Sequence, residues 1–217
     1  GGPWVTPDRT MKRLVWTETS TDGGEIALQL PLPDLKPIYS GRTVAAAPFF
    51  RDIAVFAVPA TTERIPEFEK KSAWGARPIT HSHEADRTGI ARDQVLNVTA
   101  KLDATGRLTA ALPPGKWTLL RMGFTTTGKT NHPAVKEGHG LEIDKLDAAA
   151  VTFQFEQSLG RLLKEAGPLA GTTFNALLFD SFEGGFQNWT ASLPEAFQAQ
   201  KGYDLMPWLP VLTGRVI

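Results

Sequence analysis

The stretch FNALLFDSFEGGFQNW, residues 174–189, is the basis of the fold prediction, because an apolar run leads directly into an acidic and aromatic loop. The run from Phe174 to Phe179 is short and apolar, which is typical of a strand buried on both faces of a parallel sheet. In barrel enzymes the catalytic groups lie at the C-terminal ends of such strands. We therefore predict that Asp180 and Glu183 lie at the mouth of a parallel barrel.

Helical patterns flank this predicted strand. Upstream, Asp144 suits an N-cap, the segment Gly167-Pro168 suits a helix end, and an apolar stripe lies between them: Val151, Phe155, Leu159, Leu162 and Ala166. Downstream, Ser192 and Glu195 have capping-box spacing for a second helix that ends at Gly202. Helix, strand and helix in this order form the repeating unit of a (β/α) barrel or a doubly wound sheet.

In residues 25–125 the apolar residues follow a strand-like pattern and not the helical spacing of the third zone. They contain short segments rich in Val, Leu, Thr and aromatic residues, with turn signals between them: EIALQL, IAVFAVP, VLNVTAK, GRLTAAL and WTLLRMGF. Several such strands with Pro-rich connections predict a β-sandwich or jelly-roll-like domain. In residues 1–24, Thr6 suits a helix cap, Pro7 suits the first helical position, and Met11 to Val15 would give a short apolar face.

The predicted fold class is therefore α/β plus β, a portion of a (β/α)8 barrel with an inserted β-sandwich domain. The predicted divisions are a barrel segment at 1–24, the sandwich at 25–125, and a second barrel segment at 126–217 that carries the catalytic loop. Because the chain starts without Met and stops where another element would begin, we expect the rest of a parent chain to be its partner.

Composition excludes several classes of function. The 217 residues contain 23 basic and 23 acidic side chains, whereas a nucleic-acid binder needs a basic surplus. The absence of Cys excludes disulfides, Cys-ligated zinc and Cys nucleophiles. No apolar run approaches the ~20 residues that span a bilayer. We expect neither nucleic-acid binding nor a membrane span.

The loop after the predicted strand suits sugar chemistry. Aromatic rings stack on the apolar faces of sugars, and Phe182, Phe186 and Trp189 lie beside Asp180 and Glu183. Apolar surroundings and a neighbouring carboxylate would raise the pKa of one acid, which is the state required to protonate a leaving group. The alternative interpretation is an Asp at a strand end and a solvated loop Glu, with no catalytic role.

A second polar loop, TTTGKTNHPAVKEGHGLEIDK at 125–145, carries further candidates. Its Gly-Lys-Thr lacks the upstream Gly and the following helix of a phosphate-binding loop, so we reject that interpretation. Oxygen ligands suit calcium, and Glu137, Glu142 and Asp144 are candidates for it, although the EF-hand spacing is absent. These carboxylates also fit a surface loop and a helix cap, and His132 fits an ordinary hydrogen-bonded loop residue.

Several segments together resemble glycoside hydrolase family 106, the bacterial α-L-rhamnosidases. The likeness covers most of the chain in a consistent order: GGPWVTP at 1–7, FFRDIAVFAVP at 49–59, LPPGKWTLLRMGFTTTGKTNHPA at 112–134, GLEIDKL at 140–146, EAGPLAG at 165–171, DSFEGGFQNWT at 180–190 and GYDLMPWLPVLTGRV at 202–216. The resemblance implies a (β/α)8 barrel with β-sandwich domains, an inverting mechanism, calcium dependence and a periplasmic or secreted bacterial location.

The resemblance also implies roles for single residues. Glu183 matches the family's general acid and Asp180 the acidic residue before it, while the general base is expected beyond Ile217. Inversion needs both carboxylates, ~6.5–9.5 Å apart. We expect Asp180, Asn188 and His132 to hold hydroxyls of a rhamnosylated glycan or plant glycoside, directly or through calcium, and Trp189 or Phe186 to face the rhamnose methyl group.

Two other classes of function remain open from the sequence. The β-rich middle zone and the aromatic residues also fit a non-catalytic carbohydrate-binding module, although such modules lack the helix–strand–helix pattern of the third zone. A structural or regulatory fragment without a ligand is the other alternative. Glycan binding without hydrolysis by the full-length protein would indicate the module.

Overall fold

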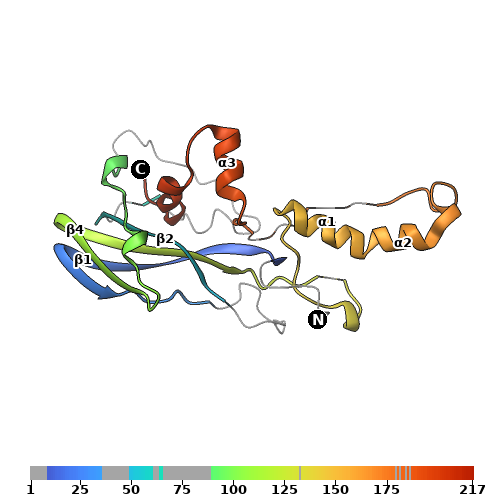
Figure 1. Ribbon diagram of the computed structural model, residues 1–217, viewed down its shortest axis with the longest axis horizontal. Helices are drawn as coiled ribbons and strands as arrows, with labels where there is room; N and C mark the ends of the chain where they lie inside the picture. Colours follow the sequence, from blue (N-terminus) through green and yellow to red (C-terminus); the bar gives the residue numbers. More distant parts are fainter. Residues whose placement is uncertain are drawn as a thin grey trace. The chain divides into compact units, whose positions relative to one another are not determined.

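The computed structural model of the chain describes residues 9–35, 49–60, 64–65, 89–131, 133–178, 180, 182–183, 185 and 187–217 (Figure 1). The chain divides into two compact units. Unit 1 comprises Gly1–Arg13, Lys36–Phe49 and Thr126–Leu193, and unit 2 comprises Leu14–Leu35, Phe50–Thr125 and Pro194–Ile217. The helices of the described part are all too short or too polar to cross a membrane.

The main sheet has four strands, all within residues 12–126. These strands are β1 (Lys12–Gln29), β2 (Arg51–Pro59), β3 (Leu96–Asn97) and β4 (Arg107–Thr126), in the spatial order β1-β4-β2-β3. Strand β2 pairs antiparallel with both β3 and β4. Residues 25–125 are therefore rich in strands as expected, and the predicted β-sandwich stays a prediction.

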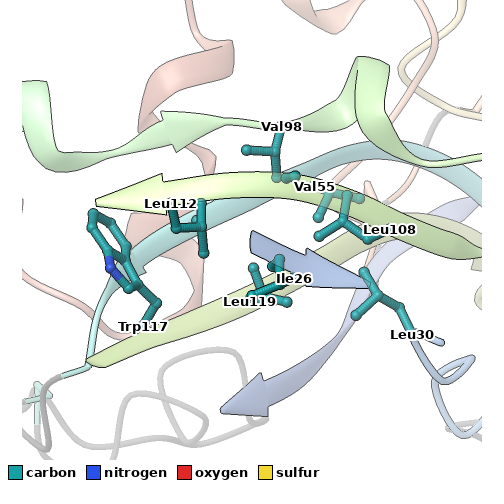
Figure 2. Packing of buried hydrophobic residues seen from close by; sticks show 10 residues of the cluster. Ile26, Leu30, Val55, Val98, Leu108, Leu112, Trp117 and Leu119 are labelled. Carbon is teal, nitrogen blue, oxygen red and sulfur yellow. The ribbon is translucent and has the colours of Figure 1, made fainter. Parts of the chain in front are cut away.

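A buried apolar cluster of unit 2 lies on one face of these strands. Leu108, Ala110 and Leu112 alternate with exposed residues along the first part of β4, as expected for a strand with one buried face. The buried cluster that they join comes from β1, β2, β4 and the segment after β3: Ile26, Leu30, Val55, Ala57, Val98, Leu108, Ala110, Leu112, Trp117 and Leu119 (Figure 2). Burial of this apolar surface, at ~25 cal/mol per Å2, is the main stabilising contribution of the sheet.

Both long strands bend back on themselves. In β1, the Thr17 hydroxyl donates to the carbonyl of Pro31, 14 residues along the chain, at 3.1 Å. In β4, the Trp117 indole donates to the carbonyl of Pro113 at 2.8 Å, and Figure 2 shows the two arms of β4 running side by side. The Pro-Pro-Gly-Lys signal at 113–116 therefore marks a real turn, and Gly115 has the positive φ of 132° that favours glycine.

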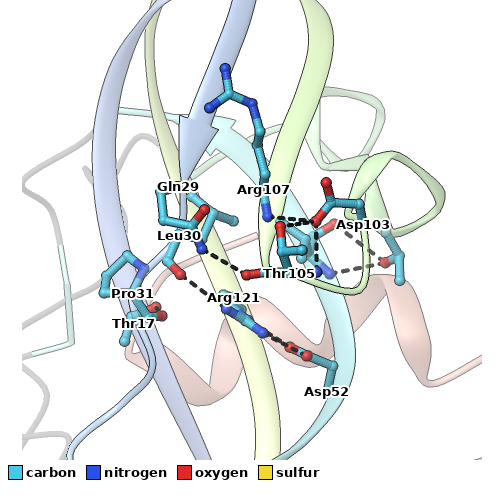
Figure 3. A network of polar contacts seen from close by, with 11 residues as sticks. Thr17, Gln29, Leu30, Pro31, Asp52, Asp103, Thr105, Arg107 and Arg121 are labelled. Carbon is cyan, nitrogen blue, oxygen red and sulfur yellow. Dashed lines mark hydrogen bonds and ion pairs between the residues drawn. The ribbon is translucent and has the colours of Figure 1, made fainter.

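Arg121 of β4 links β2 and the segment after β1. It donates to both carboxylate oxygens of Asp52 on β2, at 2.7 and 2.8 Å, and to the carbonyl of Leu30 after β1 at 2.9 Å (Figure 3). The hydrogen bond to Asp52 raises the pKa of Arg121 above its ordinary value. A bidentate guanidinium–carboxylate pair of this kind fixes the relative orientation of the two side chains as well as their distance.

Unit 1 contains two consecutive helices, α1 (Ala148–Gln157) and α2 (Leu159–Ala166). The predicted helical stripe is therefore present, but the helix is interrupted at Ser158, whose φ and ψ are −118° and −91°. The cap is Asp147, which accepts from the backbone of Ala149, and Asp144 has another role. Gly167, with φ 51°, ends α2 as predicted. In unit 2, α3 (Leu193–Lys201) ends before Gly202, also as predicted.

Two predicted elements are wrong. Residues 12–15 begin strand β1, where a short helix was expected, and the predicted division between residues 24 and 25 falls inside that strand. The cap signals at Thr6 and Pro7 lie outside the described residues. β-branched residues such as Val15, Thr17 and Thr19 favour a strand, and pairing within the sheet outweighs local helix signals.

The apolar run at 174–180 is the second correction. Residues 174–178 and 180 belong to no strand, and Phe174 makes only an isolated parallel bridge with Ala170. Leu178 is 94 % exposed. An apolar run forms a central strand only when neighbouring strands supply hydrogen bonds on both sides, and the described residues form no strand beside this run. The barrel part of the predicted fold therefore stays a prediction.

Candidate active site

Three chain segments of unit 1 come together around residues 9–12. The backbone of this segment forms antiparallel bridges through Thr10 with Ile143 and through Lys12 with Trp189. The amide of Asp144 donates to the carbonyl of Arg9 at 2.7 Å, which fixes the end of the 125–145 loop against the same segment. Residues 9–12 therefore lie between the start of the α1 region and the end of the 180–189 loop.

Asp144 is the centre of the buried contacts in this region. Its side chain is fully buried and accepts from the Lys12 ammonium at 2.6 Å, from the Thr190 hydroxyl at 3.0 Å, from the Leu146 amide at 3.0 Å and from the Gln187 amide group. Each carboxylate oxygen thus has two donors. Because a buried charge is tolerated only when it is paired and hydrogen-bonded, this network holds the three segments in one arrangement.

Gln187 links this network to the 180–189 loop. Its carbonyl oxygen accepts from the backbone amide of Lys145 at 3.2 Å, while its amide group donates to Asp144. The amide of the next residue, Asn188, donates to the carbonyl of Lys12 at 3.2 Å. The C-terminal end of the loop that carries Glu183 is therefore anchored on both its side-chain and its backbone atoms.

Two lysines hold Glu183 itself. The Lys129 ammonium donates to the Glu183 carbonyl at 2.9 Å and to its carboxylate Oε2 at 3.2 Å, and the Lys145 ammonium donates to the same carbonyl at 3.3 Å. Lys145 also lies 3.9 Å from Glu142 Oε2. The Lys129 side chain is 18 % exposed and that of Glu183 is 66 % exposed, so their ion pair is worth ~0–1 kcal/mol.

This setting differs from the one expected for Glu183. The sequence predicted a carboxyl group in apolar surroundings, but the side chain is mostly exposed and forms an ion pair with the Lys129 ammonium. Phe182 is 70 % exposed, whereas Trp189 is 3 % exposed and lies in the bridge with Lys12. Among the described residues, the sequence did not predict the lysine contacts that Glu183 makes here.

The other predicted site residues are placed as follows. Asp180 and Asn188 are exposed, at the two ends of the loop that contains Glu183. The buried indole of Trp189 does not face solvent, so a role as a wall for a sugar would require the loop to move. His132 and Phe186 lie outside the described residues. The roles of these residues in binding stay predictions.

The three carboxylates considered for calcium do not form a metal site. Asp144 already accepts four hydrogen bonds, and Glu142 faces the Lys145 ammonium. No group of three or more His, Asp or Glu residues within the described ranges is arranged to hold a metal ion. Calcium is therefore an expectation from the resemblance only, and no catalytic step is derived through it.

Comparison with known proteins places this chain in a family. The family model described as alpha-L-rhamnosidase, glycoside hydrolase family 106, matches residues 1–217. The chain belongs to glycoside hydrolase family 106. The family predicted from the sequence motifs is thus confirmed.

Two relatives of this family 106 chain differ in their names. A protein of Formosa agariphila named "Putative beta-glucuronidase" is 39 % identical over 222 residues, which cover 99 % of this chain and 18 % of the relative. A rhamnosidase structure from Novosphingobium sp. PP1Y matches with a TM-score of 0.77 and 24 % identity, covering all of this chain and 34 % of that protein. The second match shows a shared fold. The chain spans about a fifth and about a third of these proteins.

Proposed function

We propose that the protein containing this chain is a glycoside hydrolase that releases terminal α-L-rhamnose from a glycan or plant glycoside by an inverting mechanism. The family match over the whole chain supports the reaction class. The single observation that carries the site assignment is the exposed Glu183 carboxylate on a loop fixed by Lys129, Lys145 and the Asp144 network.

In this mechanism Glu183 gives a proton to the glycosidic oxygen as the bond to the rhamnose carbon breaks. A second carboxylate, which we expect beyond Ile217, takes a proton from the water that attacks the opposite face of the sugar. Asp180 and Asn188, both exposed on the same loop, are available for sugar hydroxyls. Such hydrogen bonds orient the substrate for the reaction.

A second candidate reaction is the release of a β-linked glucuronic acid. Two observations favour it: the name of the relative from Formosa agariphila and the two lysine ammonium groups at Glu183, which suit a carboxylate-bearing sugar. The rhamnosidase assignment is preferred because the family description agrees with it.

Matched aryl glycosides separate these candidates. We expect the full-length protein to hydrolyse an aryl α-L-rhamnoside and to leave an aryl β-D-glucuronide intact. Because the mechanism inverts the anomeric carbon, NMR should detect β-L-rhamnose as the first product. Hydrolysis of the glucuronide alone would establish the second candidate. Binding of rhamnosylated glycans without hydrolysis of either aryl glycoside would indicate a carbohydrate-binding module.

A further inference from the structure

The loop that carries Glu183 contains a Gly-Gly pair directly after it. These residues are Gly184 and Gly185, and Gly185 has a φ of 55°. Glycine tolerates a wide range of backbone angles, so local conformational preference does little to hold a neighbouring residue in one place. The position of the Glu183 carboxyl group therefore depends on contacts between this loop and other segments of unit 1.

Gln187 makes such a contact with both ends of its side-chain amide. Its NH2 group donates to Oδ1 of Asp144, and its carbonyl oxygen accepts from the backbone amide of Lys145 at 3.2 Å. An ionised carboxylate can only accept a hydrogen bond, and a backbone amide can only donate one. The glutamine side chain satisfies both partners at once, which a carboxylate or an ammonium group at this position would not do.

The two residues that Gln187 contacts have different roles. Asp144 is fully buried and pairs with the Lys12 ammonium at 2.6 Å, so it is a fixed point of unit 1. Lys145 reaches in the other direction, because its ammonium donates to the Glu183 carbonyl at 3.3 Å. Gln187 thus connects a buried, paired carboxylate with a lysine that contacts the main chain of Glu183.

We propose that Gln187 is a positioning residue for the general acid, and that it holds the loop and Lys145 where the Glu183 carboxyl group reaches the glycosidic oxygen. This inference rests on the proposed function and adds a residue to its site. Gln187 itself transfers no proton. Because a displacement of about 1 Å in a reacting group costs up to ~10²-fold in rate, loss of this contact should reduce turnover although the acid is still present.

The first test is Gln187→Met in the full-length protein. Methionine keeps the length of the side chain but has neither the amide donor nor the amide acceptor. We expect kcat on a flavonoid rhamnoside to fall by ~10–10²-fold with little change in KM, because a displaced acid weakens the transition state and not substrate binding. An aryl rhamnoside with an acidic leaving group needs less protonation and should lose much less.

Gln29→Met is the matched control. Gln29 ends β1 in unit 2, where its amide group donates to the carbonyl of Thr105 at 2.8 Å. The substitution removes a glutamine hydrogen bond there as well, but one without a connection to Glu183. We expect kcat on both rhamnosides to stay at the wild-type value. A loss in Gln29→Met with the same dependence on the leaving group would contradict a specific role of Gln187.

A double variant separates positioning of the acid from a general effect on the fold. If Gln187 acts through Glu183, its substitution should matter little once Glu183→Gln has removed the proton donor. The double variant Glu183→Gln/Gln187→Met should therefore have the kcat of Glu183→Gln alone. A further loss of the size that Gln187→Met causes by itself would mean that Gln187 acts independently of the acid, and the inference would be wrong.

Gln187→Glu is a second variant, which does not depend on tolerance of methionine. Its new carboxyl group, when ionised, lacks the donor and faces the carboxylate of Asp144. The other charges of the network are the ammonium groups of Lys12 and Lys145. A protonated carboxyl group has one donor and one acceptor, as the amide has. We expect the ratio of variant to wild-type kcat to rise toward one as the pH falls, and a ratio independent of pH would count against the proposal.

These outcomes distinguish the inference from the function on which it rests. Equal losses in Gln187→Met on the two rhamnosides, together with unequal losses in Glu183→Gln, would overturn the positioning role and leave the proposed acid in place. Absence of rhamnose release from either substrate by the wild-type protein would overturn both.

Discussion

Glu183 is held through its main chain as much as through its carboxylate. Lys129 and Lys145 both donate to its carbonyl oxygen, and Gln187 anchors the loop after it. A side-chain substitution at this position should therefore leave the loop in place. Because main-chain contacts hold the loop, an isosteric substitution of Glu183 tests the catalytic role of its carboxyl group and should disturb the fold little.

Glu183→Gln in the full-length protein should reduce turnover according to the leaving group. The amide keeps the size and hydrogen bonding of the side chain but has no proton to transfer, and general acid catalysis is worth ~10²–10⁴-fold. We expect a loss of that order on a flavonoid rhamnoside and a smaller loss on an aryl rhamnoside with an acidic leaving group. Equal losses on both substrates, measured as kcat/KM, would rule out the general-acid role.

Asp144→Asn should destabilise the protein although the change is small. The Lys12 ammonium would remain buried, at 3 % exposure, without a compensating charge, and breaking such a pair costs about 3–5 kcal/mol. Asp147→Asn is the matched control, because Asn caps helices about as well as Asp. Chemical denaturation of both variants provides the measurement, and equal stability of the two would contradict a structural role of the Lys12–Asp144 pair.

Glu18 should make the stability of unit 2 sensitive to acid. Burial raises the pKa of Glu18, but hydrogen bonds from Arg215 and Arg64 outweigh this effect and lower the pKa from 4.5 to about 2. A lowered folded-state pKa contributes stability above the unfolded value of 4.5, and this contribution is lost as the pH falls toward 2. We expect Glu18→Gln to unfold at a lower temperature than wild type at neutral pH.

The difference in unfolding temperature between Glu18→Gln and wild type should become smaller as the pH falls from 4.5 toward 2. Thermal unfolding midpoints of the two proteins, followed from neutral pH down to about pH 3, test the linkage. Parallel curves over this range would show that Glu18 has the same pKa in the folded and unfolded protein.

At the scale of elements, the long strands β1 and β4 depend on close backbone approach. A Cβ added at Gly23 of β1 would lie 1.9 Å from the carbonyl oxygen of Pro113 in β4. Backbone atoms cannot move aside as a flexible side chain can. Packing between the strands thus requires glycine at position 23.

Gly23→Ala should therefore destabilise unit 2, by ~1–3 kcal/mol as for other overpacked sites. Gly138→Ala, where the nearest atom is 3.6 Å from the added Cβ, is the control and should change stability by less than ~0.5 kcal/mol. Urea unfolding of the two variants measures the difference. A neutral result at Gly23 would mean that β1 and β4 separate readily at this point.

At the scale of the whole molecule, several large apolar side chains of unit 1 are exposed. Leu178, Val135 and Phe182 are 94 %, 72 % and 70 % exposed. Exposed apolar groups of this size normally contact another part of a protein or a ligand. The match to only 34 % of the solved rhamnosidase is consistent with contacts supplied by further chain.

The 217-residue chain expressed alone should therefore be poorly soluble and should not hydrolyse aryl α-L-rhamnosides. An inverting glycosidase needs a second carboxylate, which we expect to lie beyond Ile217. Sedimentation and a rhamnose-release assay on the isolated chain, beside the full-length protein, provide the measurements. Turnover by the isolated chain at the rate of the full-length protein would show that the base lies within these residues.

Local sequence patterns were sufficient for features with a short-range physical cause. Composition and turn signals predicted a strand at GRLTAAL, residues 106–112, the glycines at 167 and 202 predicted helix ends, and the motifs predicted the family. Tertiary structure alone decided that residues 12–29 form a strand and that the apolar run before Asp180 does not, because strand formation requires pairing partners elsewhere in the chain. It also brought Lys129 to Glu183 and Lys12 to Asp144, across 54 and 132 residues. Ion pairs at such separations leave no periodic signal in the sequence, because their energy depends on where the fold places two charges.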